Sequence, residues 1–395
     1  MPAASADGWT ASWIAPQQRV WQPDFVLPAG IPYALDGHTV RQTLRLSSGG
    51  RRLRLVLGNR YGSQPVHIGK TTVRRADGKG SLKTVRFNGK TAALIPAGGT
   101  ITSDPVALAA PDLAVLETDI YLPQHTPLHT FHWDGRQTAY IAKGELNGKP
   151  FPTDAAETTA RLLLAAVQVE NAEALPAVAV LGDSITDGNA ATLNQNTRWP
   201  DYLAERLAPR RTAVINAGIS GARLLSDGMS EKAAARLEAD VFAQPNVKTL
   251  IVLLGINDIA HPGTLFAPKE SRPTLDRLAA GYRRLTAQAH ARGIRVIAAT
   301  LPPFAGALPD TPLDNYYHPE KDELRRRFNQ WIRQNKDFDG VIDFDTALRD
   351  PEHPDRLNPA YDSGDHLHPG DAGSRAMAEA VDLDMLAPPS AAQQP

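Results

Sequence analysis

The pattern of apolar and polar residues differs between the two halves of the chain. From about residue 39 to residue 143, short runs rich in β-forming residues alternate with clusters of Gly, Pro, Asn and Asp. Residues 43–46 and 53–57 show the period-2 alternation of strands that bury one face. Many short strands without helical runs between them predict a β-sandwich of jelly-roll type. Further runs of this kind lie at residues 66–68, 84–87, 106–108, 116–122 and 137–142.

After about residue 155, continuous apolar runs replace the alternating ones. Such runs are typical of parallel strands that are buried on both faces. They lie at residues 177–181, 213–215, 250–254, 296–299 and 341–342. Helical periodicity appears between them, with one apolar face at residues 275–289 and another at residues 324–332. This alternation of strands and helices predicts a three-layer α/β/α domain.

The two patterns predict how the chain is divided. We expect an N-terminal β-sandwich domain with its linker at residues 1–170 and an α/β domain at residues 171–387. The linker is expected around residues 144–175, with a strand at 161–169 as an option within it. Residues 388–395 contain only Pro, Ser, Ala and Gln, a composition that predicts a disordered tail.

Composition and charge exclude several classes of protein. The 395 residues include 42 Lys+Arg and 43 Asp+Glu, a balance that argues against nucleic-acid binding through phosphate neutralisation. The absence of cysteine excludes disulfide scaffolds, thiolate metal sites and cysteine nucleophiles. No apolar run approaches the roughly 20 residues of a membrane-spanning helix, so we expect no membrane insertion. Residues 1–8 lack a signal-peptide pattern, which fits a cytosolic protein or the mature part of an exported one.

Polar residues gather where the predicted parallel strands end. Gly-Asp-Ser-Ile-Thr-Asp-Gly follows the first strand at residues 182–188, and Asn-Ala-Gly-Ile-Ser-Gly follows the second at 216–221. Gly-Ile-Asn-Asp follows the third at 255–258, and Ser-Gly-Asp-His-Leu-His-Pro lies at 363–369. In open α/β sheets, ligands bind beyond the carboxyl ends of the strands. These four segments can therefore converge on one site.

Their side chains include the parts of an ester-hydrolysing site. Ser184, on a strand-to-helix turn, is the candidate nucleophile; His368 can take its proton, and Asp365 can fix the tautomer of that histidine. Simpler readings exist, because a serine at such a turn often caps a helix. His366 and Asp362 are local rivals for the base and the acid.

Three groups are candidates for an oxyanion hole. These are the backbone N–H groups of Ser184 and Gly218 and the side-chain amide of Asn257. Gly218 has no Cβ to block a substrate, although a purely structural turn would also explain a glycine there. Asn257 can alternatively satisfy a turn. Asp183 is expected to brace the Ser184 turn rather than to react.

The four segments, in this order, resemble those of the SGNH hydrolases, also called GDSL lipases and acylhydrolases. The resemblance covers residues 177–386 and places the signature positions of the family on Ser184, Gly218, Asn257 and His368, with the acid on Asp365. It implies a flavodoxin-like sheet with strand order 2-1-3-4-5.

Some stretches resemble one branch of this family more closely, the arylesterases and acetyl-esterases linked to plant polysaccharide breakdown. The similar stretches are residues 198–204, 255–259 and 361–369, and a Trp-containing start like residues 9–13 accompanies an N-terminal β domain in that branch. One departure is Gly-Ala-Arg at residues 221–223, where the resemblance leads us to expect Gly-Asn-Arg.

The leading hypothesis is a serine esterase that removes short acyl groups, acetyl above all, through an acyl-enzyme intermediate. It needs no cofactor and no metal, and its substrates would be small acyl esters or acylated polysaccharide. Polysaccharide chemistry favours a periplasmic or secreted protein, with a cytoplasmic one left open. No long apolar lid segment is present, which argues against a true lipase.

Two other functions remain open at this stage. A metal-dependent ester hydrolase could use His366 and His368 together with Asp183 and Asp187. Alternatively, the N-terminal domain could bind carbohydrate beside a weak esterase, through Tyr61, Phe131, Trp133 and Tyr140, although Trp133 is expected to pack between the domains.

Two smaller expectations concern aromatic residues and a basic run. Candidates for lining the substrate pocket are Trp199, Phe304, Tyr316 and Tyr317, with core packing as the alternative for Trp199. The three consecutive arginines at residues 325–327 are expected on a solvated helix face.

Overall fold

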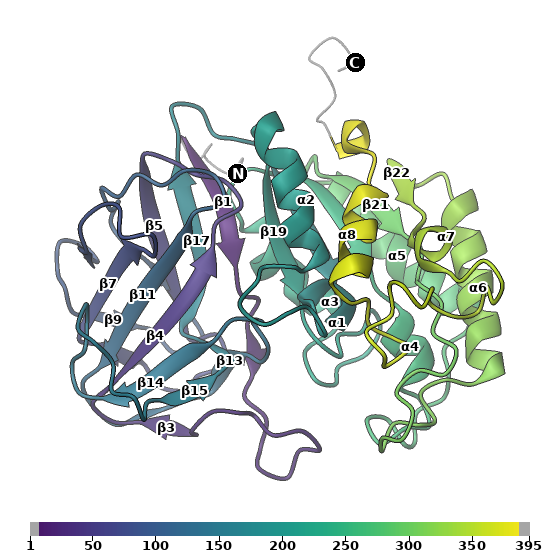
Figure 1. Cartoon of the computed structure of the whole chain (residues 1–395), viewed down its shortest axis with the longest axis horizontal. Helices are drawn as coiled ribbons and strands as arrows, with labels where there is room; N and C mark the ends of the chain where they lie inside the picture. The colour runs from purple at the N-terminus through teal and green to yellow at the C-terminus, as the bar shows by residue number, and fades with distance from the viewer. Residues whose placement is uncertain (1–7, 387–395) are drawn as a thin grey trace. The chain divides into compact units, whose positions relative to one another are not determined.

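The structure is a computed structural model, and it describes residues 8–386 of the chain (Figure 1). Two compact units can be distinguished. The first holds the chain up to Leu175 together with Leu193–Asn196 and Ala208–Ile215, and the second holds the remaining segments from Pro176 onward. The tail expected at residues 388–395 lies outside the described residues. Among residues 8–386, no helix is long and apolar enough to cross a membrane.

The first unit is built from antiparallel strands. A four-stranded sheet has the order β1-β17-β5-β10, a six-stranded sheet has the order β15-β14-β4-β11-β7-β8, and three small sheets complete the unit. The strands are β1 (Trp9–Ile14), β2 (Gln18–Arg19), β3 (Ala34–Leu35), β4 (His38–Arg45), β5 (Arg52–Gly58), β6 (Val66–Ile68), β7 (Lys70–Arg75), β8 (Lys83–Val85), β9 (Ala93–Ile95), β10 (Thr100–Thr102), β11 (Val115–Leu122), β12 (Thr126–Pro127), β13 (Thr130–His132), β14 (Ala139–Lys143), β15 (Ala156–Thr158), β16 (Arg161–Leu162) and β17 (Leu164–Glu170).

The alternation seen in the sequence is the alternation of burial. In β5, Leu53, Leu55 and Leu57 are fully buried, whereas Arg52 is exposed and Arg54 is half-buried. Side chains of successive strand residues point to opposite faces, so this pattern places one face of β5 in the core. The antiparallel, strand-rich character predicted for the N-terminal part is confirmed.

Of two strands expected in this part, one is present and one is not formed in full. The strand expected at residues 106–108 is reduced to an isolated bridge between Leu53 and Val106. The strand considered at residues 161–169, within the linker expected around residues 144–175, is present as β16 and β17. Strand β17 pairs with both β1 and β5, so this part of the expected linker lies inside a sheet. Gln168 of β17 accepts a hydrogen bond from Arg54 Nε of β5 at 2.5 Å.

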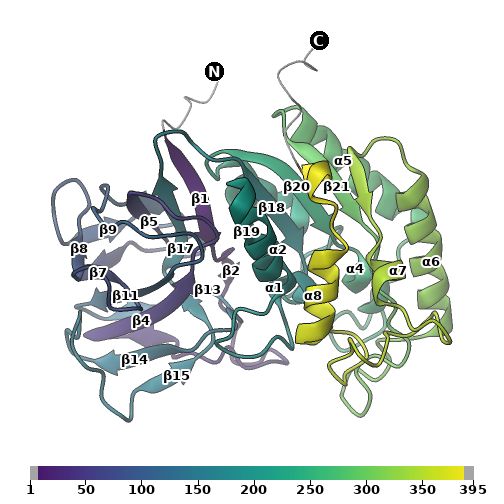
Figure 2. The same ribbon diagram turned by 45° about the horizontal axis from the view of Figure 1, so that its top comes forward.

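The chain from Ala177 onward forms a parallel sheet with the order β19-β18-β20-β21-β22 (Figure 2). Numbered along the chain, this is the order 2-1-3-4-5 implied by the family resemblance, which is confirmed. Each side chain of β18 is buried, as expected of a central strand covered on both faces. The strands are β18 (Ala177–Gly182), β19 (Ala213–Gly218), β20 (Val247–Leu253), β21 (Arg295–Ala299) and β22 (Gly340–Ile342).

Helices cover both faces of this sheet, which gives the three layers expected (Figures 1 and 2). Helix α2 packs against α8, and α5 packs against α6. The α-helices are α1 (Ser184–Asp187), α2 (Trp199–Leu207), α3 (Ala233–Leu237), α4 (Ile256–Ala260), α5 (Leu275–His290), α6 (Pro319–Gln334), α7 (Phe344–Leu348) and α8 (Asp371–Glu379). The other helical turns are η1 (Ala208–Arg210), η2 (Glu238–Phe242) and η3 (Leu383–Leu386).

The arginine run in α6 does not form one solvated face. Arg325 is 1% exposed, whereas Arg326 and Arg327 are exposed. Arg325 precedes Phe328 by three residues, so both side chains lie on the face of α6 that points into the protein. The prediction of a solvated Arg325 was therefore wrong.

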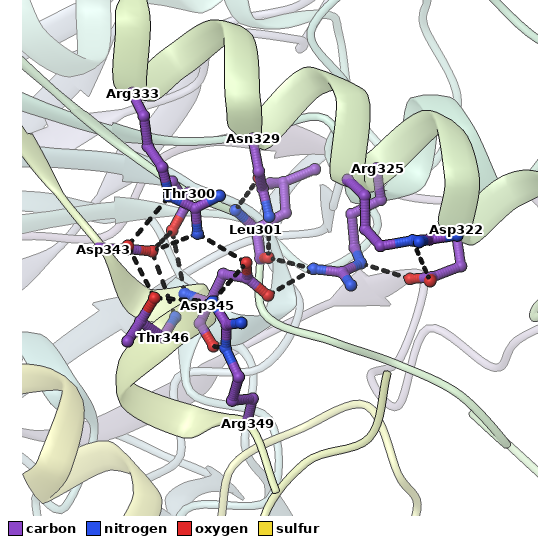
Figure 3. A network of polar contacts seen from close by, with 11 residues as sticks. Thr300, Leu301, Asp322, Arg325, Asn329, Arg333, Asp343, Asp345, Thr346 and Arg349 are labelled. Carbon is purple, nitrogen blue, oxygen red and sulfur yellow. Dashed lines mark hydrogen bonds and ion pairs between the residues drawn. The ribbon is translucent and has the colours of Figure 1, made fainter. Parts of the chain in front are cut away.

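Figure 3 shows the polar network that holds Arg325. Its guanidinium donates to Asp322 and to Asp345, each at 2.7 Å, and to the carbonyl of Leu301 at 3.0 Å. Asn329 holds the same backbone, since Leu301 N–H donates to Asn329 Oδ1 and Asn329 Nδ2 donates to Leu301 O, each at 2.8 Å. The network joins α6 and α7 to the start of the loop that follows β21.

Candidate active site

Ser184 lies at the point where the first parallel strand turns into α1. Asp183 is the N-cap of that short helix, and its Oδ1 accepts the N–H of Ile185 at 3.1 Å. Asp183 is fully buried beside the turn. This capping bond stabilises the turn that presents Ser184 at the carboxyl end of β18. Open α/β folds bind ligands at this edge of the sheet.

Ser184, His368 and Asp365 form a continuous chain of hydrogen bonds. His368 Nε2 lies 2.8 Å from Ser184 Oγ, and His368 Nδ1 lies 2.6 Å from Asp365 Oδ2. An ionised carboxylate only accepts hydrogen bonds, so Nδ1 carries the ring proton and Nε2 is left to accept from the hydroxyl. This is the arrangement in which a histidine can remove the serine proton.

Asp365 is held as an anion by the residues around it. Its Oδ1 accepts the backbone N–H groups of Leu367 and His368, at 2.9 and 2.7 Å. Burial by itself would raise the pKa of this carboxyl, but its hydrogen bonds and its electrostatic interaction with His368 lower the pKa well below its ordinary value. Asp365 therefore stays ionised at neutral pH.

The loop after β19 is fastened to α1. Asp187 Oδ2 accepts both the N–H and the hydroxyl of Ser220, at 2.8 and 2.9 Å, and Asn216 Nδ2 donates to Thr186 O at 2.7 Å. Segments that are about 30 residues apart in sequence are thereby held together. The loop that follows Ser220 is consequently placed beside the helix that begins with Ser184.

The predicted oxyanion donors differ in whether they are available. Asn257 is buried, and the N–H of Ser184 has no hydrogen-bond partner within residues 8–386. The N–H of Gly218 already donates to Asn216 Oδ1 at 2.9 Å. A Cβ at position 218 would lie 2.4 Å from the backbone N of Asp187, so close packing against α1 explains this glycine. The amide of Gly218, expected to face the oxyanion, is therefore occupied.

Gly221, three residues further on, has a backbone N–H that the sequence reasoning did not consider. Its φ is +72°, a left-handed conformation that glycine adopts without steric cost. No partner for its N–H is found in the part of the chain that the structure describes. Gly221 lies between Ser220, which is bound to α1, and Ala222, whose carbonyl accepts from Asn257 Nδ2 at 3.1 Å. The signal in the sequence that could have pointed to Gly221 is that it is the second glycine of the segment at residues 216–221.

Residues 180–376 match the sequence model of the GDSL-like lipase/acylhydrolase family. The chain belongs to this family. As a family of acylhydrolases, it identifies the protein as a carboxylic ester hydrolase, which confirms the enzyme class expected from the sequence.

Solved structures similar to this GDSL protein cover about half of it. A GDSL-like lipase from Bacteroides thetaiotaomicron has 19% sequence identity and a TM-score of 0.39, over 53% of this chain and 87% of that chain. An acetylxylan esterase from Geobacillus stearothermophilus has 24% identity and a TM-score of 0.39, over 53% of this chain and 94% of that chain. A search of curated protein sequences found no match.

Two buried aspartates flank the site of the GDSL protein. Burial raises the pKa of Asp183 to about 7, and its Oδ2 has no hydrogen-bond partner among residues 8–386. Burial also raises the pKa of Asp258 to about 6. The two oxygens of Asp258 accept the N–H groups of Leu224 and Leu225, at 2.7 and 2.8 Å. Asp258 thus fastens the other end of the loop that Asp187 holds.

The residues considered for a metal site are engaged in other contacts. His366 Nδ1 is hydrogen-bonded to Asp362, and His368 contacts Asp365 and Ser184. No group of three or more His, Asp or Glu side chains within residues 8–386 is arranged to hold a metal ion.

The aromatic candidates separate into packed and half-buried residues. Trp199 is fully buried against Phe344, so the core-packing alternative describes it. Phe304 and Tyr316 are also buried, and their rings pack edge to face at 6.0 Å. In the first unit Phe131 is buried, and Trp133 packs on Trp21 and donates its Nε1–H to Pro28 O at 3.1 Å. The other two N-terminal candidates, Tyr61 and Tyr140, are half-buried.

Proposed function

We propose that this GDSL protein is a serine esterase that removes short acyl groups, acetyl above all, through an acyl-enzyme intermediate. The observation that carries the proposal is the chain of hydrogen bonds from Ser184 Oγ through His368 to Asp365, with distances of 2.8 and 2.6 Å. Three side chains from two separate parts of the sequence meet in the order that nucleophilic catalysis of ester hydrolysis requires.

The reaction follows from the roles of these groups. Ser184 Oγ attacks the ester carbonyl carbon while His368 Nε2 takes the hydroxyl proton. The tetrahedral intermediate collapses as His368 returns that proton to the departing alkoxide, which leaves an acyl-Ser184 ester. A water molecule, deprotonated by His368, attacks this ester and releases the carboxylic acid. Asp365 stabilises the histidine whenever it carries two protons.

The oxyanion of each tetrahedral intermediate needs hydrogen-bond donors. We assign them as the N–H of Ser184, the free N–H of the Asn257 amide and the N–H of Gly221. Gly221 replaces Gly218 in this proposal because the Gly218 amide is bonded to Asn216. Each donor of this kind typically contributes about 2.7–4 kcal/mol to transition-state stabilisation.

Acetylated plant polysaccharide is the substrate class that we propose first, on the resemblance to that branch of the family. A series of p-nitrophenyl esters from acetate to octanoate, followed by acetylated xylan and pectin, tests the acyl group and the acceptor. The proposal predicts the highest kcat/KM for acetate and the release of acetate from at least one polymer. A polymer substrate would further place the enzyme in the periplasm or outside the cell, which fractionation of the native host checks.

The nucleophile is tested by comparing Ser184→Ala with Ser363→Ala, a change at an exposed serine of the loop that carries Asp365. On p-nitrophenyl acetate, Ser184→Ala should lower kcat by roughly 10⁴-fold or more. Ser363→Ala should keep activity within about twofold, because exposed substitutions rarely disturb a site. Retained activity in a folded Ser184→Ala protein would overturn the proposal.

A further inference from the structure

The amide of Asn257 is held at both of its ends. Its Oδ1 accepts the hydroxyl of Tyr316 at 2.7 Å, and its Nδ2 donates to the carbonyl of Ala222 at 3.1 Å. A flipped amide would place its oxygen against the Ala222 carbonyl, where two acceptors repel each other. The two contacts therefore select one orientation, and they leave one N–H of Nδ2 for another acceptor.

Tyr316 comes from outside the four sequence segments that supply the other site residues. It lies in the loop between β21 and α6 and is 2% exposed. Its ring packs edge to face against His261 at 5.8 Å and against Phe304 at 6.0 Å. A tyrosine ring that is packed on two sides has little freedom to move its hydroxyl away from Asn257.

A buried lysine fastens this tyrosine to the helix that carries Asn257. Lys321 Nζ donates to the carbonyl of Asn315 at 2.8 Å and to the carbonyl of Ala260 at 2.6 Å. Asn315 immediately precedes Tyr316, and Ala260 is the last residue of α4, in which Asn257 lies. Lys321 is thus a second connection between the loop that carries Tyr316 and the helix that carries Asn257, and it helps to hold the hydroxyl against the amide.

We propose that Tyr316 is a positioning residue, whose hydroxyl orients the Asn257 amide so that its free N–H meets the developing oxyanion. The inference rests on the proposed function, in which Asn257 is an oxyanion donor. Burial raises the pKa of the Tyr316 hydroxyl well above 10, so it remains a donor over the whole working pH range. Burial also lowers the pKa of His261 to about 3, so the ring beside Tyr316 is neutral.

The first test compares Tyr316→Phe with Tyr202→Phe. Tyr202 is the matched control, because it is another buried tyrosine of the same unit and its ring packs under Arg375 at 4.2 Å rather than against Asn257. Tyr316→Phe keeps the ring and removes one hydrogen bond, so kcat should fall by about tenfold while KM changes less than about threefold. Tyr202→Phe should leave both constants within about twofold. Equal behaviour of the two variants would overturn the proposal.

A double-mutant cycle separates positioning from a general structural effect. Asn257→Ala should lower kcat by about 10²- to 10³-fold, as loss of an oxyanion donor does. In the Asn257→Ala background, Tyr316→Phe should cost less than about twofold, because it acts only through the missing amide. An unchanged tenfold cost in that background would contradict the inference.

Thermal unfolding of all four proteins accompanies the cycle. If Asn257→Ala does not fold, Asn257→Ser takes its place in the same design. Failure of the inference is distinguishable from failure of the proposed function, because the latter would show as retained activity of Ser184→Ala whatever the tyrosine variants do.

Discussion

Two histidine–aspartate pairs lie in the loop before α8, with their histidines two residues apart, and they differ in the surroundings of the histidine. In one pair, His368 Nδ1 contacts Asp365 and the histidine side chain is 6% exposed. In the other, His366 Nδ1 contacts Asp362 and the histidine side chain is 47% exposed. The ring of His368 makes a second contact, to Ser184 Oγ.

The comparison shows that a histidine–aspartate pair is not by itself a catalytic unit. Asp362 has a structural part, because its Oδ1 accepts the N–H groups of Gly364 and His366, at 2.9 and 3.0 Å. These bonds shape the loop that presents His368. One pair thus holds the loop, while the other joins it to the candidate nucleophile.

Changing both histidines to the same residue should give the largest contrast. Asparagine suits the comparison because His366 has φ +60°, a left-handed conformation that asparagine tolerates. His368→Asn should lower kcat on p-nitrophenyl acetate by roughly 10⁴- to 10⁶-fold, since no base remains for Ser184. His366→Asn should stay within about threefold. Steady-state kinetics of both proteins check this, and a larger loss at His366 would reverse the assignment of the pairs.

Changing each aspartate to asparagine should give a smaller difference in kcat than the histidine variants do, again with the larger loss in the pair that contacts Ser184. Asp365→Asn turns an acceptor into a donor facing His368 Nδ1 and so favours the wrong tautomer, which should lower kcat by roughly 10²- to 10⁴-fold. Asp362→Asn keeps an oxygen for Gly364 and His366, and should cost less than about fivefold. The same assay measures both variants. If the two losses were equal, Asp365 would have no special relation to His368.

Asp183 shows what burial does to an aspartate that has no histidine partner. Its pKa is raised from 3.8 to about 7, whereas the pKa of Asp365 is lowered. Since the folded protein holds this proton more tightly than the unfolded chain, the contribution to stability is complete below pH 3.8 and is lost as pH rises through about 7. Relative to Asp183→Asn, the wild-type protein should lose up to about 4 kcal/mol of unfolding free energy between pH 4 and pH 8.

Urea unfolding of both proteins at several pH values in this range measures that difference. The variant retains an oxygen to cap α1, so the comparison isolates the ionisation. Parallel stability profiles would show that Asp183 is ionised in the folded state at low pH, contrary to the effect expected of its burial.

Much of the fold could be predicted because its signals are local. The apolar runs of β18 and β20 mark strands covered on both faces, and the alternation in β5 marks one buried face. The strand β17 was expected only as an option at residues 161–169 within a linker. Gln168 and Glu170 of this strand are bonded to Arg54 and Arg52 on the neighbouring strand, and no local pattern reveals that pairing.

The candidate site was predictable where its residues form short segments at strand ends, and it was not where contacts are long-range. The sequence could not decide between Gly218 and Gly221, because the choice depends on the hydrogen bond from Gly218 to Asn216. The contact of Tyr316 with Asn257 joins residues 59 positions apart, and it was not anticipated. Arg325 was misplaced for a similar reason, since its carboxylate partners include one from α7.

The most direct test of the account is covalent labelling of the wild-type protein with a fluorophosphonate, read by intact mass and peptide mapping. The account predicts a single adduct on Ser184, with esterase activity lost in proportion to labelling and with His368→Asn labelled far more slowly. An adduct on any other residue, or full activity in a completely labelled protein, would contradict it.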